Sequence, residues 1–122
     1  MFNLGNIRNA LGGQPSQPAT YVADAAAGDL AVIDVRGHDE VAQTGKAKGA
    51  VHIPLMMLPT HADPRHPDHH PVFKSGKPIA VYCASGARSS MAAQILAQNG
   101  HTQVTNIGGL GHWVQAGGEI ER

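Results

Sequence analysis

The sequence predicts an α/β domain with a central, mainly parallel sheet of five strands flanked by helices. Short apolar runs of strand length alternate along the 122 residues with segments rich in helix formers. This order is typical of parallel strands joined by right-handed helical crossovers. Several runs are apolar almost without interruption, as expected for strands that are covered on both faces of a sheet. A chain of this length can bury one substantial core.

The first half of the chain supplies three of the predicted strands. Thr20–Val22 predict a short first strand, and the alanine-rich segment Asp24–Gly28 predicts a brief helix closed by its glycine. Residues 30–36, a nearly continuous apolar run, predict the clearest early strand. A short helix begins at residues 37–41, and a third strand over residues 49–54 ends at its proline.

Two strand–helix pairs complete the predicted sheet. Ile79–Tyr82 predict a buried strand, and Met91–Gly100 predict the helix after it, because apolar residues recur at helical spacing before a terminal glycine. Gln103–Ile107 predict the fifth strand. Leu110–Ala116 predict a terminal helix in which Trp113 anchors the core.

The composition excludes several classes of function. Nine basic residues balance nine acidic residues, so the chain lacks the basic footprint of a nucleic-acid-binding protein. The single cysteine excludes an internal disulfide and a multi-cysteine zinc site, and it fits a reducing compartment. No apolar run approaches the ~20 residues of a membrane span, and no secretory signal is evident. We expect a cytoplasmic monomer that binds neither nucleic acid nor membrane.

The single cysteine, Cys83, follows the predicted strand at residues 79–82 and precedes the predicted helix at residues 91–100. A strand-to-helix turn directs backbone N–H groups into a small bowl, and the helix dipole adds positive potential there. A thiol in this setting ionises more readily than free cysteine, whose pKa is about 8.5, and the thiolate is the nucleophile. A lone cysteine is more often a small core residue. Its position at the carboxyl end of a parallel strand instead favours a catalytic role.

Four stretches resemble one known family in the same order: Ile33–Arg36 followed by Glu40, Gly45–Pro54, Tyr82–Ser89, and Asn106–Gly109 followed by Trp113. The third stretch closely matches the active-site loop Cys-x-x-Gly-x-Arg-Ser of the rhodaneses, which are sulfurtransferases. The chain therefore resembles a single-domain rhodanese over residues 20–121. Lys46-Ala47 depart from the His-Ile usual in the second stretch. Residues 55–77 form a longer segment than in the shortest members, similar to a subset with proline and histidine there.

The resemblance implies a rhodanese-like fold and a sulfur-transfer reaction without a cofactor. Cys83 would take a sulfane sulfur from thiosulfate or a persulfide-type donor, forming a persulfide, and pass it to cyanide or a thiol. The acceptor could also be a protein. The predicted persulfide-binding residues are those of the loop: Ala84, Ser85, Gly86, Ala87, Arg88 and Ser89. Their backbone N–H groups would stabilise the outer sulfur as an oxyanion hole stabilises oxygen.

Three charged residues are expected near the predicted loop, and two of them, Asp34 and Arg36, are expected to support it. Arg88 has two roles open to it: it aids anionic donors such as thiosulfate, or it pairs with Asp34 or Glu40 beneath the loop. We favour the second role. Asp34 and Arg36 lie at the carboxyl end of a predicted strand, which puts them near the site as scaffold. His52 is expected to be partly buried and hydrogen-bonded.

Two segments fall outside the alternation of strands and helices. Residues 1–18 predict a flexible N-terminal arm, because glycines and prolines follow a short run with apolar residues at helical spacing, and the domain then spans residues 19–122. Residues 55–77 contain four prolines and four histidines, and we expect a rim or lid beside the active-site loop. His66, His69 and His70 have spacings that suit zinc or copper. We expect no metal, because a proline-rich loop holds its ligands loosely.

Two rival functions remain open from the sequence. One is a cysteine phosphatase or arsenate reductase on a related scaffold. Against it, the four residues between Cys83 and Arg88 are one fewer than in those enzymes, which leaves a narrow loop for a tetrahedral oxyanion. The other rival is a non-catalytic rhodanese-like module that senses redox state or binds partners. The intact cysteine argues against a fully inactive module but not against a sensor.

Overall fold

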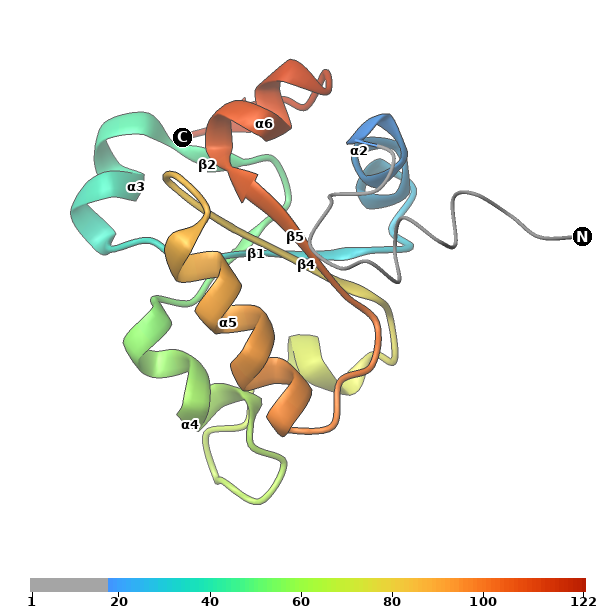
Figure 1. The fold of residues 1–122 in the computed structure, drawn as a ribbon, viewed down its shortest axis with the longest axis vertical. Coiled ribbons are helices and arrows are strands. Elements are labelled where there is room, and N and C mark those ends of the chain that lie inside the picture. Colours follow the sequence, from blue (N-terminus) through green and yellow to red (C-terminus); the bar gives the residue numbers. More distant parts are fainter. Residues whose placement is uncertain (1–17) are drawn as a thin grey trace, which may run out of the picture.

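A parallel sheet of four strands, in the order β3-β1-β4-β5, runs through the middle of the computed structural model (Figure 1). Its strands are β1 (Ala31–Asp34), β3 (Val51–His52), β4 (Ile79–Cys83) and β5 (Val104–Gly109). A separate pair joins β2 (Lys46–Ala47) antiparallel to β6 (Ile120–Glu121). The structure describes residues 18–122. The predicted arm at residues 1–18 therefore lies outside the described residues, apart from Pro18.

Helices cover both faces of the four-stranded sheet, which confirms the predicted α/β class (Figure 1). The α-helices are α2 (Pro18–Ala26), α3 (His38–Thr44), α4 (Leu58–Ala62), α5 (Ala87–Gln98) and α6 (Leu110–Gln115), and two 3₁₀ helices are η1 (Leu55–Met57) and η2 (Pro71–Lys74). Helices α4 and α5 pack on one face, and α2 and α6 pack on the other. None of the helices in residues 18–122 is long and apolar enough to cross a membrane.

The sheet has four strands rather than the five predicted, because Thr20–Val22 belong to helix α2. Pro18 stands first in this helix, a position where its fixed φ and missing N–H are well tolerated. Tyr21 is buried and stacks on Trp113 of α6, with the two ring centroids 6.1 Å apart. Tertiary packing therefore overrides the strand preference of these residues. The helix predicted at Asp24–Gly28 is the second half of the same α2.

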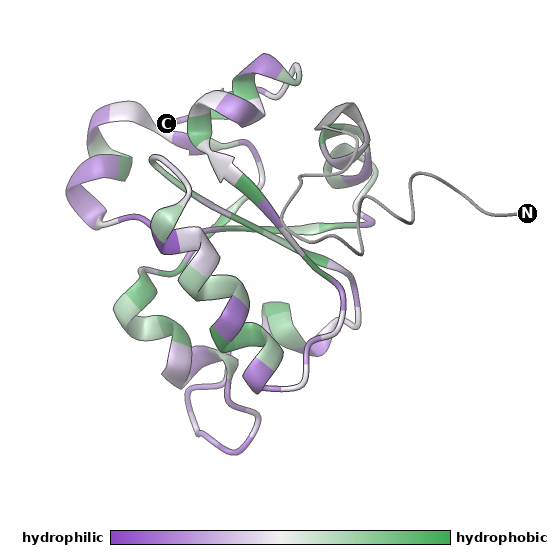
Figure 2. Cartoon of the chain, in the orientation of Figure 1, coloured by the Kyte–Doolittle hydropathy of each residue, from purple (hydrophilic) through white to green (hydrophobic). Residues whose placement is uncertain are grey.

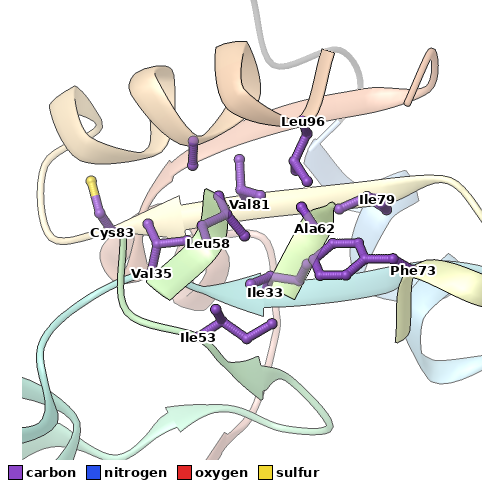
Figure 3. Close-up of a cluster of buried hydrophobic side chains, with 11 residues drawn as sticks. Ile33, Val35, Ile53, Leu58, Ala62, Phe73, Ile79, Val81, Cys83 and Leu96 are labelled. Atoms are coloured by element: carbon purple, nitrogen blue, oxygen red, sulfur yellow. The ribbon is translucent and has the colours of Figure 1, made fainter. Parts of the chain in front are cut away.

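Alternation along β4 divides the core into two halves. Ile79, Val81 and Cys83 face α4 and α5, whereas Ala80 and Tyr82 face α2 and α6. All five side chains are buried, so β4 is the centre of the domain. Figure 3 shows Cys83 at one end of the cluster that packs against α4 and α5. In Figure 2 the central strands are largely hydrophobic, while α3 and the loop that follows α4 are largely hydrophilic.

Residues 55–77 contribute three side chains to the core, which contradicts the expectation of a rim or lid for this part of the segment. Leu58 and Ala62 have no exposed surface, and Phe73 is 7% exposed. All three pack in the same cluster as Ile33 and Val81 of the sheet (Figure 3). Two of the four prolines, Pro59 and Pro71, lie in the first turns of α4 and η2, where proline is compatible with a helix. Two stretches, residues 64–68 and residues 74–77, are exposed throughout.

The buried position of Leu58 leads to a stability prediction. Replacing Leu58 with Ala removes buried methyl groups and leaves a cavity, so the free energy of unfolding should fall by about 2–5 kcal/mol. Met56→Ala is the matched control, because Met56 in the same segment is 90% exposed and should change stability little. Urea denaturation of both variants measures the difference. Equal, small effects would contradict the assignment of this segment to the core.

Candidate active site

The carboxyl ends of the parallel strands meet at one edge of the sheet and place the predicted site residues there. In the strand register, Asp34 of β1 lies opposite Tyr82 of β4, and Cys83 lies opposite Gly109 of β5. Residues 84–86 then connect β4 to α5. The sequence therefore folds the predicted loop at the edge where open parallel sheets bind ligands.

Cys83 is the last residue of β4, one position earlier than the predicted loop placement, and none of its surface is exposed. Its side chain points to the face that α5 covers (Figure 3). The backbone N–H of Gly86 donates to Sγ at 2.9 Å, and Sγ lies 3.4 Å from the Ser89 hydroxyl. Gly86 has a φ of 115°, which a residue with a side chain rarely adopts, so the loop needs a glycine at this position to curl around the sulfur.

Two opposing effects act on the pKa of the Cys83 thiol. Burial raises this pKa, because a charged thiolate is poorly solvated inside the protein. Hydrogen bonds from the Ser89 hydroxyl and from the backbone N–H groups of Ser89, Gly86 and Ser85 lower it. The hydrogen bonds prevail, and the pKa of Cys83 lies below its ordinary value. A lower pKa favours the thiolate, which is the nucleophilic form of a cysteine.

The loop residues differ in how they meet the sulfur. Ala84, Ser85 and Ala87 are exposed, so small side chains surround the mouth of the loop. Ser89 is buried and presents its hydroxyl to the sulfur from the first turn of α5. Ser85 contributes through its backbone N–H, whereas its hydroxyl makes no hydrogen bond within residues 18–122.

The end of β5 packs directly against this loop. A Cβ atom built on Gly109 would lie 2.2 Å from the carbonyl oxygen of Ala84, a distance that no side chain can accept. Only glycine therefore allows β5 to approach the loop this closely. The strand register also shifts between Val81 and Tyr82, so that Gly109 comes to lie opposite Cys83. Close contact with the Ala84 carbonyl therefore explains why the second residue of the Gly-Gly pair, Gly109, is a glycine.

Arg88 pairs with Glu40 of α3, and not with Asp34. Its two terminal nitrogens donate to the two carboxylate oxygens at 2.6 and 2.8 Å. The hydrogen bonds from Arg88, together with one from the Gly37 N–H, lower the pKa of Glu40 to about 2. This arrangement agrees with the second of the two roles predicted for Arg88, a structural pair beside the loop. Each terminal nitrogen of the guanidinium donates one hydrogen bond to this carboxylate.

Asp34 and Arg36 form a buried ion pair that supports the edge of the sheet. Arg36 Nη2 donates to Asp34 Oδ2 at 2.7 Å and to the carbonyl oxygen of Gly45, also at 2.7 Å. The Tyr82 hydroxyl donates to the same carboxylate at 2.5 Å. Burial and this hydrogen bond raise the pKa of Tyr82 well above its usual range. The pair lies one strand away from the thiol, as expected of scaffold.

The sequence analysis did not assign two residues that the structure joins to the site. Tyr82 links Asp34 to the N–H of Ala47, which donates to the tyrosine oxygen at 2.9 Å. Asn106 lies with its Oδ1 atom 2.7 Å from the Ser89 hydroxyl. Both residues belong to motifs that the sequence shares with the family. Their contacts depend on residues distant in the chain, so no local pattern marks them as part of the site.

The histidines of the segment 55–77 make local hydrogen bonds. His61 Nδ1 lies 2.8 Å from the carbonyl oxygen of Asp68, and His70 Nδ1 accepts the N–H of Val72 at 3.0 Å. Within residues 18–122, no three His, Cys, Asp or Glu side chains are arranged to hold a metal ion. His52 is partly buried, as predicted, and its Nε2 lies 2.7 Å from the carbonyl oxygen of Arg36.

The fold and the site together define an α/β domain with one buried cysteine at the carboxyl edge of its parallel sheet. The family described as the Rhodanese-like domain matches residues 18–116. The chain therefore belongs to the rhodanese-like family, as the four sequence stretches predicted.

Relatives of known sequence and structure agree with this assignment. A sulfurtransferase of Allochromatium vinosum is 31% identical over 90 residues, covering 73% of this chain and 76% of the relative. The thiosulfate sulfurtransferase PspE of Escherichia coli is 36% identical over 78 residues, covering 64% of this chain and 68% of the relative. A human single-domain sulfurtransferase has a TM-score of 0.64 at 26% identity, covering 84% of this chain and 97% of that one.

One solved structure carries a different description. A Rhodopseudomonas palustris protein of unknown function, described as a possible tyrosine phosphatase, has a TM-score of 0.76 and 36% identity. The match covers 85% of this chain and 81% of that chain. The fold is thus common to these proteins, while the descriptions of their activity differ.

The hydrogen bonds around Sγ lead to a prediction for its titration. The rate of alkylation by iodoacetamide, which follows the thiolate fraction, should reach half its maximum below the value of about 8.5 for free cysteine. The same protein unfolded in urea is the control, since unfolding removes the Gly86 and Ser89 donors and should return the midpoint to the free value. A folded midpoint at or above the free value would mean that the loop does not stabilise the thiolate.

Proposed function

We propose that the protein moves a sulfane sulfur from thiosulfate or a persulfide-type donor to a thiophilic acceptor, cyanide or a thiol, through a persulfide on Cys83. The observation that carries the proposal is the hydrogen-bonding environment of Sγ. The N–H of Gly86 donates to it at 2.9 Å, and the Ser89 hydroxyl lies beside it. These donors favour the thiolate, which is the form that attacks sulfur.

In the first step, the Cys83 thiolate attacks the outer sulfur of thiosulfate. A bond forms between Sγ and that sulfur, the sulfur–sulfur bond of thiosulfate breaks, and its electron pair leaves with sulfite. In the second step, the acceptor attacks the outer sulfur of the persulfide, and Sγ departs again as the thiolate. Cyanide becomes thiocyanate and a thiol becomes a persulfide. This is a two-step covalent mechanism with one intermediate and no cofactor.

The loop residues Ala84, Ser85, Gly86, Ala87, Arg88 and Ser89 surround this chemistry with backbone donors. The outer sulfur carries negative charge, and N–H groups directed into the loop stabilise it as they do an oxyanion. The exposed side chains at the mouth of the loop are small, so an acceptor can approach the outer sulfur in line with Sγ. A protein thiol is an acceptor of the same chemistry as a small one. A free cysteine also suits a reducing compartment, so we propose cytoplasmic action.

Phosphoryl transfer is the rival for which a related structure gives a reason. A phosphate dianion needs a ring of donors around three peripheral oxygens and a guanidinium free to bind two of them. Here four residues separate Cys83 from Arg88, and both terminal nitrogens of Arg88 are held by Glu40. These features favour a ligand as small as one sulfur atom. Sulfur transfer is therefore the proposal, and aryl-phosphate hydrolysis is its test.

Sulfur loading should be visible in the intact mass of the protein. Incubation with thiosulfate or a low-molecular-weight thiol persulfide should add one sulfur atom, and cyanide should then remove it and release thiocyanate. Cys83→Ser should abolish loading while the melting temperature stays close to that of the wild type, because the volume change is small. A wild-type mass that never rises with any of these donors would count decisively against the proposal.

Aryl phosphates should not be hydrolysed by the wild-type protein. The narrow loop and the paired Arg88 give a phosphate too few donors, so p-nitrophenyl phosphate should release no more p-nitrophenol than with Cys83→Ser. The Cys83→Ser variant is the control for contaminating phosphatases. Turnover in the wild type that disappears in this variant would replace sulfur transfer with phosphatase activity as the favoured function.

A further inference from the structure

The Ser89 hydroxyl lies among more acceptors than its single proton can serve. Its Oγ atom is fully buried and lies 2.7 Å from Asn106 Oδ1, 3.0 Å from the carbonyl oxygen of Gly86 and 3.3 Å from that of Gly108. On its other side, Cys83 Sγ lies 3.4 Å away. A hydroxyl has one hydrogen to donate and two lone pairs to accept with. These neighbours therefore compete for one proton.

Asn106 holds the strongest of these competing positions. The Gly108 N–H donates to Asn106 Oδ1 at 2.8 Å, which identifies the side-chain atom facing Ser89 as the amide oxygen. The shortest contact of Ser89 Oγ is also with this oxygen. While Cys83 is a thiol, the Ser89 proton is thus directed to Asn106. The lone pairs of Oγ are then free to accept the S–H of Cys83.

Loss of the thiol proton to solvent reverses this preference. A thiolate has no hydrogen to offer Ser89 Oγ, and the two electron-rich atoms would face each other without a proton between them. Rotation of the Ser89 hydroxyl from Asn106 to the sulfur removes that repulsion and adds a charge-assisted hydrogen bond. Asn106 keeps the Gly108 N–H as its own partner during this rotation.

We propose that Asn106 is a positioning residue of the site: its amide oxygen holds the Ser89 hydroxyl while Cys83 is a thiol and releases it to the sulfur when the thiolate forms. Asn106 therefore sets how readily the nucleophile appears, although it makes no contact with the sulfur. Its role in catalysis rests on the proposed sulfur transfer. Its effect on the titration of Cys83 does not, because deprotonation needs no sulfur donor.

The other charged and titratable groups around Cys83 are engaged elsewhere. These groups are Asp34 at the end of β1, Arg36 just after it, Tyr82 of β4, Glu40 of α3, Arg88 of α5 and His112 of α6. Asp34 binds Arg36 and the Tyr82 hydroxyl, and Glu40 binds Arg88. His112 Nδ1 accepts the N–H of Gly109 at 2.9 Å. His61, in α4 on the same face as the thiol, lies with its Nδ1 against the carbonyl oxygen of Asp68.

Substitutions at Asn106 with opposite effects on the Ser89 proton test this proposal. Asn106→Asp keeps the shape of the side chain but binds the hydroxyl proton more strongly and adds a negative charge, so the alkylation midpoint of Cys83 should rise by at least about one pH unit. Asn106→Ala removes the competing acceptor, so the midpoint should fall below that of the wild type. Asn99→Asp is the matched control, because Asn99 caps the far end of α5, and the midpoint should not move.

A double-mutant cycle separates the proton competition from the added charge. In the wild-type background, Ser89→Ala should raise the midpoint by about one pH unit, since it removes one donor to the thiolate. In the Asn106→Asp background, Ser89→Ala should add nothing, because the aspartate already withholds that proton. Equal shifts by Ser89→Ala in the two backgrounds would overturn the proposal. So would a rise of the midpoint in Asn106→Ala.

Sulfur loading by the same variants distinguishes this inference from the proposed function. If the cycle is non-additive but no variant or wild type ever gains a sulfur, the role of Asn106 in titration stands and sulfur transfer fails. If the wild type loads sulfur but the cycle is additive, sulfur transfer stands and the role of Asn106 fails. If both hold, loading at fixed pH below the wild-type midpoint should slow about three- to fourfold in Asn106→Asp for each pH unit by which its midpoint rises, because the tenfold loss of thiolate is partly offset by its higher nucleophilicity.

Discussion

The buried carboxylate of Asp34 is the interaction on which the carboxyl edge of the sheet depends. It accepts hydrogen bonds from the backbone and guanidinium of Arg36 and from the Tyr82 hydroxyl. Arg36 also reaches the turn at Gly45, so one charge ties β1, β4 and the approach to β2 together. Removing one partner of such a buried pair leaves an uncompensated charge, which is strongly unfavourable. The edge therefore has one arrangement, and Cys83 follows Tyr82 directly within it.

The sequence predicted the elements whose signals are local and missed those decided by distant contacts. The run at 79–82 and the glycines after β5 carry their information within a few residues. The segment at Thr20–Val22 has the composition of a strand, but Pro18 and the burial of Tyr21 against Trp113 make it helical. Residues 55–77 have the composition of a loop. The burial of Leu58, Ala62 and Phe73 follows from packing against sheet residues distant in the chain, which composition alone does not reveal.

The same difference between local signals and distant contacts applies to the residues of the candidate site. The loop from Cys83 to Ser89 is continuous in sequence, so its strand-to-helix geometry and its backbone donors were predictable. The partner of Arg88 was left open between Asp34 and Glu40, because that pairing depends on where α3 lies over the loop. The contact between Ser89 and Asn106 depends on the parallel pairing of β4 with β5, which puts Asn106 opposite Val81. No periodicity within either segment encodes that register.

The site stabilises a sulfur anion with dipoles instead of full charges. The arginines at this edge of the described structure, Arg36 and Arg88, are each held by a carboxylate. The sulfur is left with N–H and O–H donors from Gly86 and Ser89. This distinction has a chemical consequence, because thiolate nucleophilicity falls as the thiol becomes more acidic. A strong cation beside the sulfur would raise the fraction of Cys83 present as thiolate but lower the nucleophilicity of that thiolate. A few dipoles, one of them shared with Asn106 in our proposal, favour the thiolate without the loss of reactivity that a full charge would cause, which suits the proposed sulfur transfer.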